Sequence, residues 1–276
     1  MLGREKFLMV IRGYFKAAGN SVKLMLKNPI LYVPDIIYYA ATAFLAYFFL
    51  YLNNLTTIFS GTDLFVSRIK EVASASNLLY KLLFTLSAFV LVNFIVGLGT
   101  ISLRYVLIKQ LLENRKIEFL KAHKTVGRYV LDVFFLKILL LIIYLLPLAF
   151  FAAIALLYNS LALPMIIFAA LSIIILRFIF LFAYPALFLK GGKGAARTIS
   201  LSVKYFRSRT GHVLITGIFI LIVNLIINIM SKNITESYAG FSLLSFNYAA
   251  VIGVVFLALV NISLIIWGAV FLFKNY

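Results

Sequence analysis

Four charged residues lie within or near the ends of long apolar runs, where an ionised side chain needs a partner or a role. They are Asp35, Asp132, Lys137 and Arg177. Arg177 is the deepest, about 20 Å from Lys190 at a helical rise of about 1.5 Å per residue. A neutral pairing scheme joins Asp35 to Arg177 and leaves the other two as a second pair. The structural alternative is snorkelling of the long basic side chains to the interface. Arg177 is therefore the leading candidate for an intramembrane functional residue.

The other reactive residues do not form a catalytic or metal-binding pattern. The chain has no cysteine, which excludes thiolate chemistry and cysteine-ligated metals. His123 and His212 have no neighbouring acid cluster with metal-ligand spacing. The sequence GGKGAART, residues 191–198, is not a Walker loop, because Gly194 is followed by Ala195 and not by Lys and Ser or Thr. We expect no catalytic residue, no metal and no cofactor.

Most of the positive charge lies in three segments that flank the apolar runs, and the net charge is +18. Each juxtamembrane Lys or Arg adds about 1 kcal/mol of attraction to an anionic membrane surface. The candidate headgroup contacts are Arg12, Lys16, Lys23, Lys121, Lys124, Arg128, Lys193, Arg197, Lys204, Arg207 and Arg209. The positive-inside rule alone would also explain this charge. A nucleic acid is not an expected partner, because the sequence lacks a readout motif. The expected partners are membrane lipids, preferably anionic, and a protein partner or a second copy stays open.

The elements that must position these residues are membrane-spanning helices. Hydrophobic residues make up 64% of the chain and charged residues 12%, and about 20 apolar residues in a helix span a bilayer. Six stretches meet this length, at 30–52, 79–103, 130–157, 161–189, 212–230 and 243–273. Four asparagines in these stretches are expected to link helices by hydrogen bonds: Asn93, Asn224, Asn228 and Asn261. The three basic segments lie on one side, so both termini are expected to face the cytoplasm.

Each basic segment also has an apolar stripe with helical spacing. The stripes are Ile11, Phe15, Ala18, Val22 and Met25; Phe119, Ala122, Val126, Tyr129 and Val133; and Ala195, Ile199, Val203 and Phe206. The pattern predicts an all-α membrane protein of three transmembrane hairpins, each preceded by a basic amphipathic interfacial helix. The chain then forms one polytopic domain, 1–276, with repeat-like units at about 1–110, 111–190 and 191–276.

Turn residues mark two of the expected elbows. Gly191, Gly192 and Gly194 are expected to end the fourth span and to permit a sharp bend into the next helix. Asn28 is expected to be the N-cap of the first span, with Pro29 in its first turn.

The segment LRFIFLFAYPALFLKGGKGAARTISLSVKYFRSRTGHVLI, residues 176–215, resembles the membrane domain attached to some bacterial glycerophosphodiester phosphodiesterases and similar stand-alone prokaryotic proteins with six spans. The matching residues are Arg177, Pro185, Gly191, Gly192, Ala196 and Ser200. Lys190 departs from that family, which often has an acid there. The resemblance implies a six-span architecture in a prokaryotic cytoplasmic membrane. It brings no enzymatic residue, because the catalytic domain of those enzymes has no counterpart in this sequence.

Three classes of function remain open. The favoured interpretation is a non-enzymatic membrane component, a lipid-interacting scaffold or an auxiliary subunit of a membrane assembly. A transporter or channel subunit would use Arg177, Asp35 and the asparagines of the spans to line a cavity. A lipid-active enzyme would need acids that converge in a cytoplasmic cleft.

Overall fold

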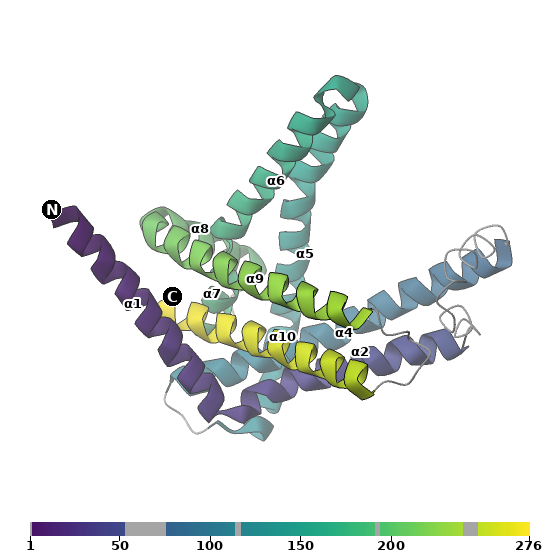
Figure 1. Cartoon of the computed structure of the whole chain (residues 1–276), viewed down its shortest axis with the longest axis horizontal. Coiled ribbons are helices and arrows are strands. Elements are labelled where there is room, and N and C mark those ends of the chain that lie inside the picture. The colour runs from purple at the N-terminus through teal and green to yellow at the C-terminus, as the bar shows by residue number, and fades with distance from the viewer. Residues whose placement is uncertain (1, 53–75, 114–116, 191–193, 240–247) are drawn as a thin grey trace. The chain divides into compact units, whose positions relative to one another are not determined.

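The computed structural model describes residues 2–52, 76–113, 117–190, 194–239 and 248–276, and this part of the chain is helical with no strand (Figure 1). Its α-helices are α1 (Leu2–Lys27), α2 (Val33–Leu52), α4 (Ser76–Leu112), α5 (Phe119–Leu157), α6 (Ala162–Ile179), α7 (Ala183–Leu189), α8 (Ala195–Ser208), α9 (Thr210–Ala239) and α10 (Tyr248–Asn275). Short 3-10 helices occupy Pro29–Tyr32 and Asn159–Leu161.

Five helical stretches within the described residues are long and apolar enough to cross a membrane. They are Pro29–Phe49, Leu83–Leu112, Phe119–Leu157, Ala162–Leu189 and Val255–Asn275. A sixth is added if α8 and the first part of α9, which meet at 103°, count as one broken span. The prediction of an all-helical, polytopic membrane protein is thus confirmed for the part of the chain that is described.

Contacts divide the chain into two compact units, which cut across the three predicted repeats. The first unit comprises Met1–Leu31, Ser102–Val223 and Ile266–Tyr276, and the second comprises Tyr32–Ile101 and Asn224–Ile265. The boundaries pass through α4, α9 and α10, so each of these long helices contributes to both units.

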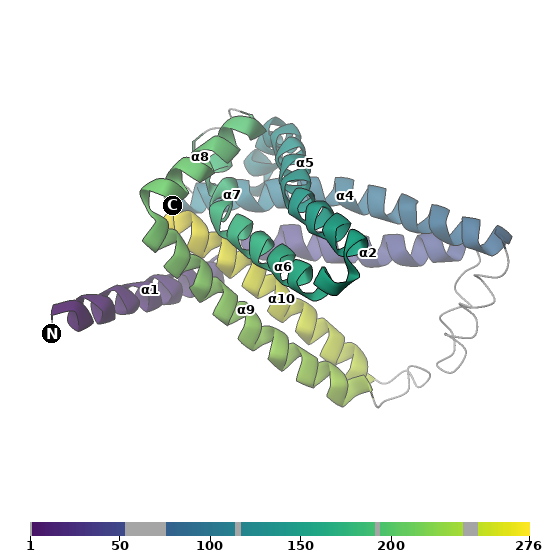
Figure 2. The same ribbon diagram turned by 90° about the horizontal axis from the view of Figure 1, so that it is seen from above.

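In the second unit, α2 and the first part of α4 run side by side in both views (Figures 1 and 2). Asn93 on α4 joins them, because its Oδ1 accepts a hydrogen bond from Thr42 Oγ1 at 2.7 Å. The Asn93 Nδ2 group donates to Tyr38 Oη at 3.1 Å. Asn93 therefore links two helices, as the sequence predicted for this residue.

In the first unit, α5 and α6 form an antiparallel hairpin that both views show clearly. The second basic segment is not a separate interfacial helix as predicted, because α5 continues from Phe119 to Leu157 without a break. Gly127 is the only glycine of α5 before Pro147, and no proline between them interrupts helical hydrogen bonding. Three residues of the predicted apolar stripe, Ala122, Val126 and Val133, are buried.

The buried face of α1 differs from its predicted stripe. Ala18 and Met25 are buried, but Phe15 is 63% exposed, and Ser21 is buried beside them. The Ser21 hydroxyl donates to Ala17 O at 2.9 Å, so it enters the protein interior without an unmet donor. Hydropathy alone could not assign this serine to the buried face.

The residues between α1 and α2 also act differently from the prediction. Asn28 does not act as an N-cap: its Nδ2 donates to Leu24 O at 2.8 Å, at the carboxyl end of α1. Carbonyls in the last turn of a helix have no partner within the helix, and this side-chain amide supplies one. Pro29 begins the following 3-10 helix, in the first turn where a proline was expected.

Candidate lipid interface

A break separates α6 from α7, and α8 begins beyond α7 at Ala195. The ring of Pro185 would collide with the carbonyl of residue 181 in a continuous helix, and proline has no amide hydrogen to donate. The chain leaves the helix over Phe180–Phe182 and resumes it at Ala183. Phe182 is buried at this break, so the turn is fixed by packing as well as by the proline.

The start of α8 depends on a glycine. Gly194 has φ of +87°, which only glycine adopts readily. The Thr198 hydroxyl then donates to Gly194 O at 3.0 Å. The expectation of a glycine-permitted bend is confirmed at this residue, whereas 191–193 lie outside the described residues.

The buried face of α8 consists of small and hydroxyl residues and keeps only Ala195 of the predicted apolar stripe. Ala195, Thr198 and Ser202 are buried, whereas Ile199 and Val203 are half-buried, as is Phe206. α8 contacts α5, α6 and α7. The Ser202 hydroxyl donates to Ile179 O at 2.9 Å, and so satisfies a carbonyl at the end of α6. Small side chains let α8 approach its neighbouring helices closely. Close approach therefore determines which face of α8 is buried, more than the hydropathy of the side chains does.

The opposite side of α8 presents basic residues to the surroundings. Four of the predicted lipid-contacting residues are exposed, and none of them forms an ion pair within the part of the chain that the structure describes. They are Arg197, Lys204, Arg207 and Arg209. The Arg209 guanidinium lies 5.6 Å from the centroid of the Tyr205 ring. Lys193, predicted to belong to this set, lies outside the described residues.

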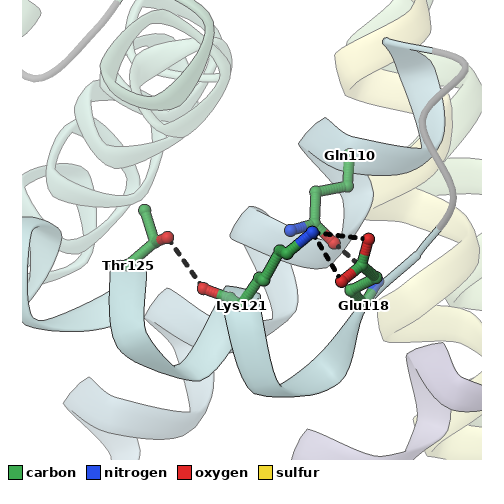
Figure 3. Close-up of polar contacts among 4 residues, drawn as sticks. All are labelled: Gln110, Glu118, Lys121 and Thr125. Carbon is green, nitrogen blue, oxygen red and sulfur yellow. Dashed lines mark hydrogen bonds and ion pairs between the residues drawn. The ribbon is translucent and has the colours of Figure 1, made fainter.

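The basic residues at the start of α5 are not equivalent (Figure 3). Lys121 Nζ lies 2.8 Å from a carboxylate oxygen of Glu118, and the Glu118 backbone amide donates to Gln110 Oε1 at 3.2 Å. Lys124 and Arg128 are exposed and form no ion pair among the described residues. Of these basic residues, Lys121 is the one whose charge Glu118 offsets. The sequence pattern did not predict this ion pair.

The basic residues of α1 are exposed as well: Arg12, Lys16 and Lys23. The helix that carries them is fixed to the rest of the first unit by Trp267, whose Nε1 donates to Ala18 O at 3.3 Å. Phe15 packs edge-on against Phe219, with ring centroids 5.5 Å apart. Three exposed basic groups, on α1, α5 and α8, therefore belong to the same unit.

A histidine-centred cluster at the α8–α9 elbow was missed in the sequence. His212 Nε2 lies 2.9 Å from the Asn275 carbonyl oxygen, which can only accept, so this nitrogen carries the hydrogen. The other ring nitrogen, Nδ1, then accepts from the Tyr14 hydroxyl in the neutral imidazole. Tyr205 Oη also donates to Asn275 O, at 3.0 Å. Burial raises the pKa of Tyr205, with Arg209 acting in the opposite direction, and this keeps the hydroxyl a donor.

This cluster joins α1, α8, α9 and the end of α10. Its contact between Tyr14 and His212 joins residues that are 198 positions apart in the sequence, and no motif connects the members. Only the fold brings them together, so the sequence offered no signal by which to find them.

The intramembrane charges occupy different surroundings. Asp35 is 1% exposed at the start of α2, in the second unit. Asp132 and Lys137 are half-buried on α5, and Lys137 lies close enough to Arg104 to interact with its charge. Arg104, one residue beyond the predicted span 79–103, is 8% exposed within α4.

Arg177 is exposed on α6, near the Tyr144 hydroxyl of α5. It belongs to the first unit and Asp35 to the second.

Comparisons with known proteins add no relative: the chain matches no protein-family model, no curated protein and no solved structure. Function must therefore be inferred from the site itself.

Proposed function

We propose that this protein is a non-enzymatic integral membrane component that binds anionic lipid headgroups and organises a membrane assembly as a scaffold or auxiliary subunit. The observation that supports this most is α8, which has one face fixed to the protein by Ser202 and the other face lined with cations that form no ion pair within the described residues. A helix so attached has little freedom to turn its charges away. We place α8 along the cytoplasmic surface of the membrane, where such charges meet lipid phosphates.

The bend of 103° between α8 and α9 suits this placement, because a helix at about a right angle to a span lies parallel to the surface. Four exposed cations at about 1 kcal/mol each supply roughly 4 kcal/mol of attraction to an anionic leaflet. Lys124 and Arg128 on α5, together with the basic residues of α1, extend the proposed surface. In this arrangement both termini face the cytoplasm of a prokaryotic cell, and the spans pair as three hairpins.

A transporter built around Arg177 is less well supported. The residue is exposed on α6, a position that favours a contact with something outside the chain over the lining of an internal cavity. A lipid-active enzyme would need acids beside the basic surface, and Glu118 is already paired with Lys121.

The lipid proposal is tested by native mass spectrometry of the protein released from nanodiscs that hold equal amounts of phosphatidylglycerol and phosphatidylcholine. Wild type is expected to retain phosphatidylglycerol preferentially. The double variant Lys204→Ala/Arg207→Ala loses about 2 kcal/mol of attraction, which corresponds to an affinity roughly 30-fold lower.

The matched control is Lys81→Ala, which removes one exposed charge of α4 in the second unit, outside the proposed surface, and it is compared with Lys204→Ala alone. It is expected to keep the preference. If the two single variants lose the lipid equally, net charge explains binding and the proposal fails for α8.

A further inference from the structure

Four exposed polar residues of α8 lie in one stripe, which we call the α8 stripe. They are Arg197, Ser200, Lys204 and Arg207. At 3.6 residues per turn they lie within about 80° of one another around the helix axis, and the centre of the buried face of α8 is about 170° away from them. The hydrogen bond from Ser202 to Ile179 O holds that buried face against the protein. The α8 stripe therefore points in a fixed direction, away from the protein.

The α8 stripe contains two sets of hydrogen-bond donors. Arg197 and Ser200 form the first set, and Lys204 and Arg207 form the second. Residues three positions apart are neighbours on a helix surface, so the two side chains of each set can converge on one anion. Arg197 and Lys204 begin the two sets and are seven positions apart, which is about two turns or about 10.5 Å along the axis. The stripe thus offers two anion-binding positions side by side.

The donors in both sets suit a phosphodiester group. Arginine and lysine side chains donate charge-assisted hydrogen bonds to phosphate oxygens. The Ser200 hydroxyl forms no hydrogen bond within the described residues, so it is available to donate to the same anion as Arg197. The sequence of α8 contains no Asp or Glu. No carboxylate of this helix therefore competes with a phosphate for the stripe.

We propose that the α8 stripe binds one phospholipid that carries two phosphodiester groups joined by a short bridge, as in diphosphatidylglycerol. This inference rests on the proposed placement of α8 along the membrane surface and names the class of lipid that it binds. A helix parallel to the surface holds both donor sets at one depth, where the two phosphates of one headgroup also lie. Because the second phosphate is tethered to the first, its binding is an intramolecular step and is favoured over the binding of a second lipid.

The test uses the full-length protein in phosphatidylcholine nanodiscs that also contain phosphatidylglycerol and diphosphatidylglycerol, in amounts that supply equal phosphate. Native mass spectrometry of the released protein distinguishes the two anionic lipids by their masses. Wild type is expected to retain diphosphatidylglycerol about tenfold more per phosphate than phosphatidylglycerol, because one molecule engages both donor sets.

Variants of the α8 stripe assign this preference. Arg197→Ala/Asn20→Arg moves one charge from the first donor set to an exposed position of α1 and keeps the net charge. It is expected to lose most of the preference and still to retain phosphatidylglycerol. Asn20→Arg alone is the matched control and should keep the preference fully, and Arg197→Lys should keep most of it. Ser200→Ala removes only a hydroxyl donor and should lower retention of diphosphatidylglycerol about threefold.

Three results would overturn the proposal. The first is that wild type retains the two anionic lipids in proportion to their phosphate, which would leave general attraction to an anionic leaflet as the explanation. The second is an undiminished preference in Arg197→Ala/Asn20→Arg. The third is displacement of the bound lipid by an equal concentration of the deacylated diphosphate headgroup, which would make a soluble anion the occupant of the stripe.

The Lys204→Ala/Arg207→Ala variant separates this inference from the proposed lipid-binding function. It should lose both anionic lipids, because it removes two charges from the surface, whereas Arg197→Ala/Asn20→Arg should lose only the preference between them. If wild type retains phosphatidylglycerol through Lys204 and Arg207 but does not prefer diphosphatidylglycerol, the lipid class is wrong and the lipid-binding function remains.

Discussion

Both α6 and α8 present arginines on exposed faces of the first unit, but the neighbours of these arginines differ. On α8, Arg197 and Arg207 lie among other cations and exposed hydroxyl residues such as Ser200. On α6, Arg177 lies alone among exposed isoleucine and leucine residues. A guanidinium that faces a headgroup layer costs little, whereas one that faces hydrocarbon costs several kcal/mol unless it is paired. The side chains around an arginine therefore indicate its role better than its charge alone does.

The largest expected effect separates the two arginine environments directly. Arg177→Leu should stabilise the isolated protein by up to about 3 kcal/mol, because leucine among the exposed apolar side chains of α6 removes the cost of a charge that has no ion pair within the described residues. Equilibrium unfolding in phosphatidylcholine bicelles measures the free energy. Arg207→Leu on α8 is the control and should change it by less than about 0.5 kcal/mol. If the two variants change the free energy of unfolding by similar amounts, the surroundings of Arg177 and Arg207 do not differ in the way described above.

The next effect concerns the attachment of α8. Ser202→Leu should destabilise the protein by about 3 kcal/mol, because a large side chain must fit where the serine is 1% exposed and because Ile179 O loses its donor. Ser200→Leu, on the exposed side of the same helix, should have little effect. Thermal unfolding in one detergent compares them, and a tolerated leucine at 202 would show that α8 is not held by this face.

A smaller effect is expected at the α8–α9 elbow. Tyr14→Phe removes the hydroxyl that donates to His212 Nδ1 and should lower the free energy of unfolding by about 1 kcal/mol. Tyr47→Phe, at a residue that is 64% exposed on α2, is the control and should be neutral. If the two variants unfold alike, the histidine cluster does not fix α1 to this elbow.

The positions of the spans could be predicted from the sequence, because an apolar run of bilayer length has few alternatives to a helix. The break before α7 could also be anticipated from Pro185, and the bend before α8 from Gly194. These are local effects, in which the residue itself restricts the backbone.

Which face of a helix is buried, and which groups its side chains bond to, were harder to predict. The start of α5 has the charge stripe of an interfacial helix, but without a helix-breaking residue it continues into the span. On α8, Thr198 and Ser202 are polar in composition yet buried, because their hydroxyls bond to backbone carbonyls. The contact between Tyr14 and His212 depends on the packing of distant helices, which a single sequence does not encode in any local pattern.

The smallest expected effect concerns the basic residues at the start of α5, of which Lys121 is paired with Glu118. Glu118→Gln removes the carboxylate that holds Lys121 at 2.8 Å but keeps a side chain of similar shape. The freed lysine should strengthen retention of phosphatidylglycerol by a few tenths of a kcal/mol up to about 1 kcal/mol, since an exposed ion pair is itself worth no more than that. Native mass spectrometry from mixed nanodiscs measures the change, with Glu118→Gln/Lys121→Gln as the control that should cancel it. An increase that persists in the double variant would mean that Glu118 repels lipid directly, and Lys121 would then leave the proposed surface.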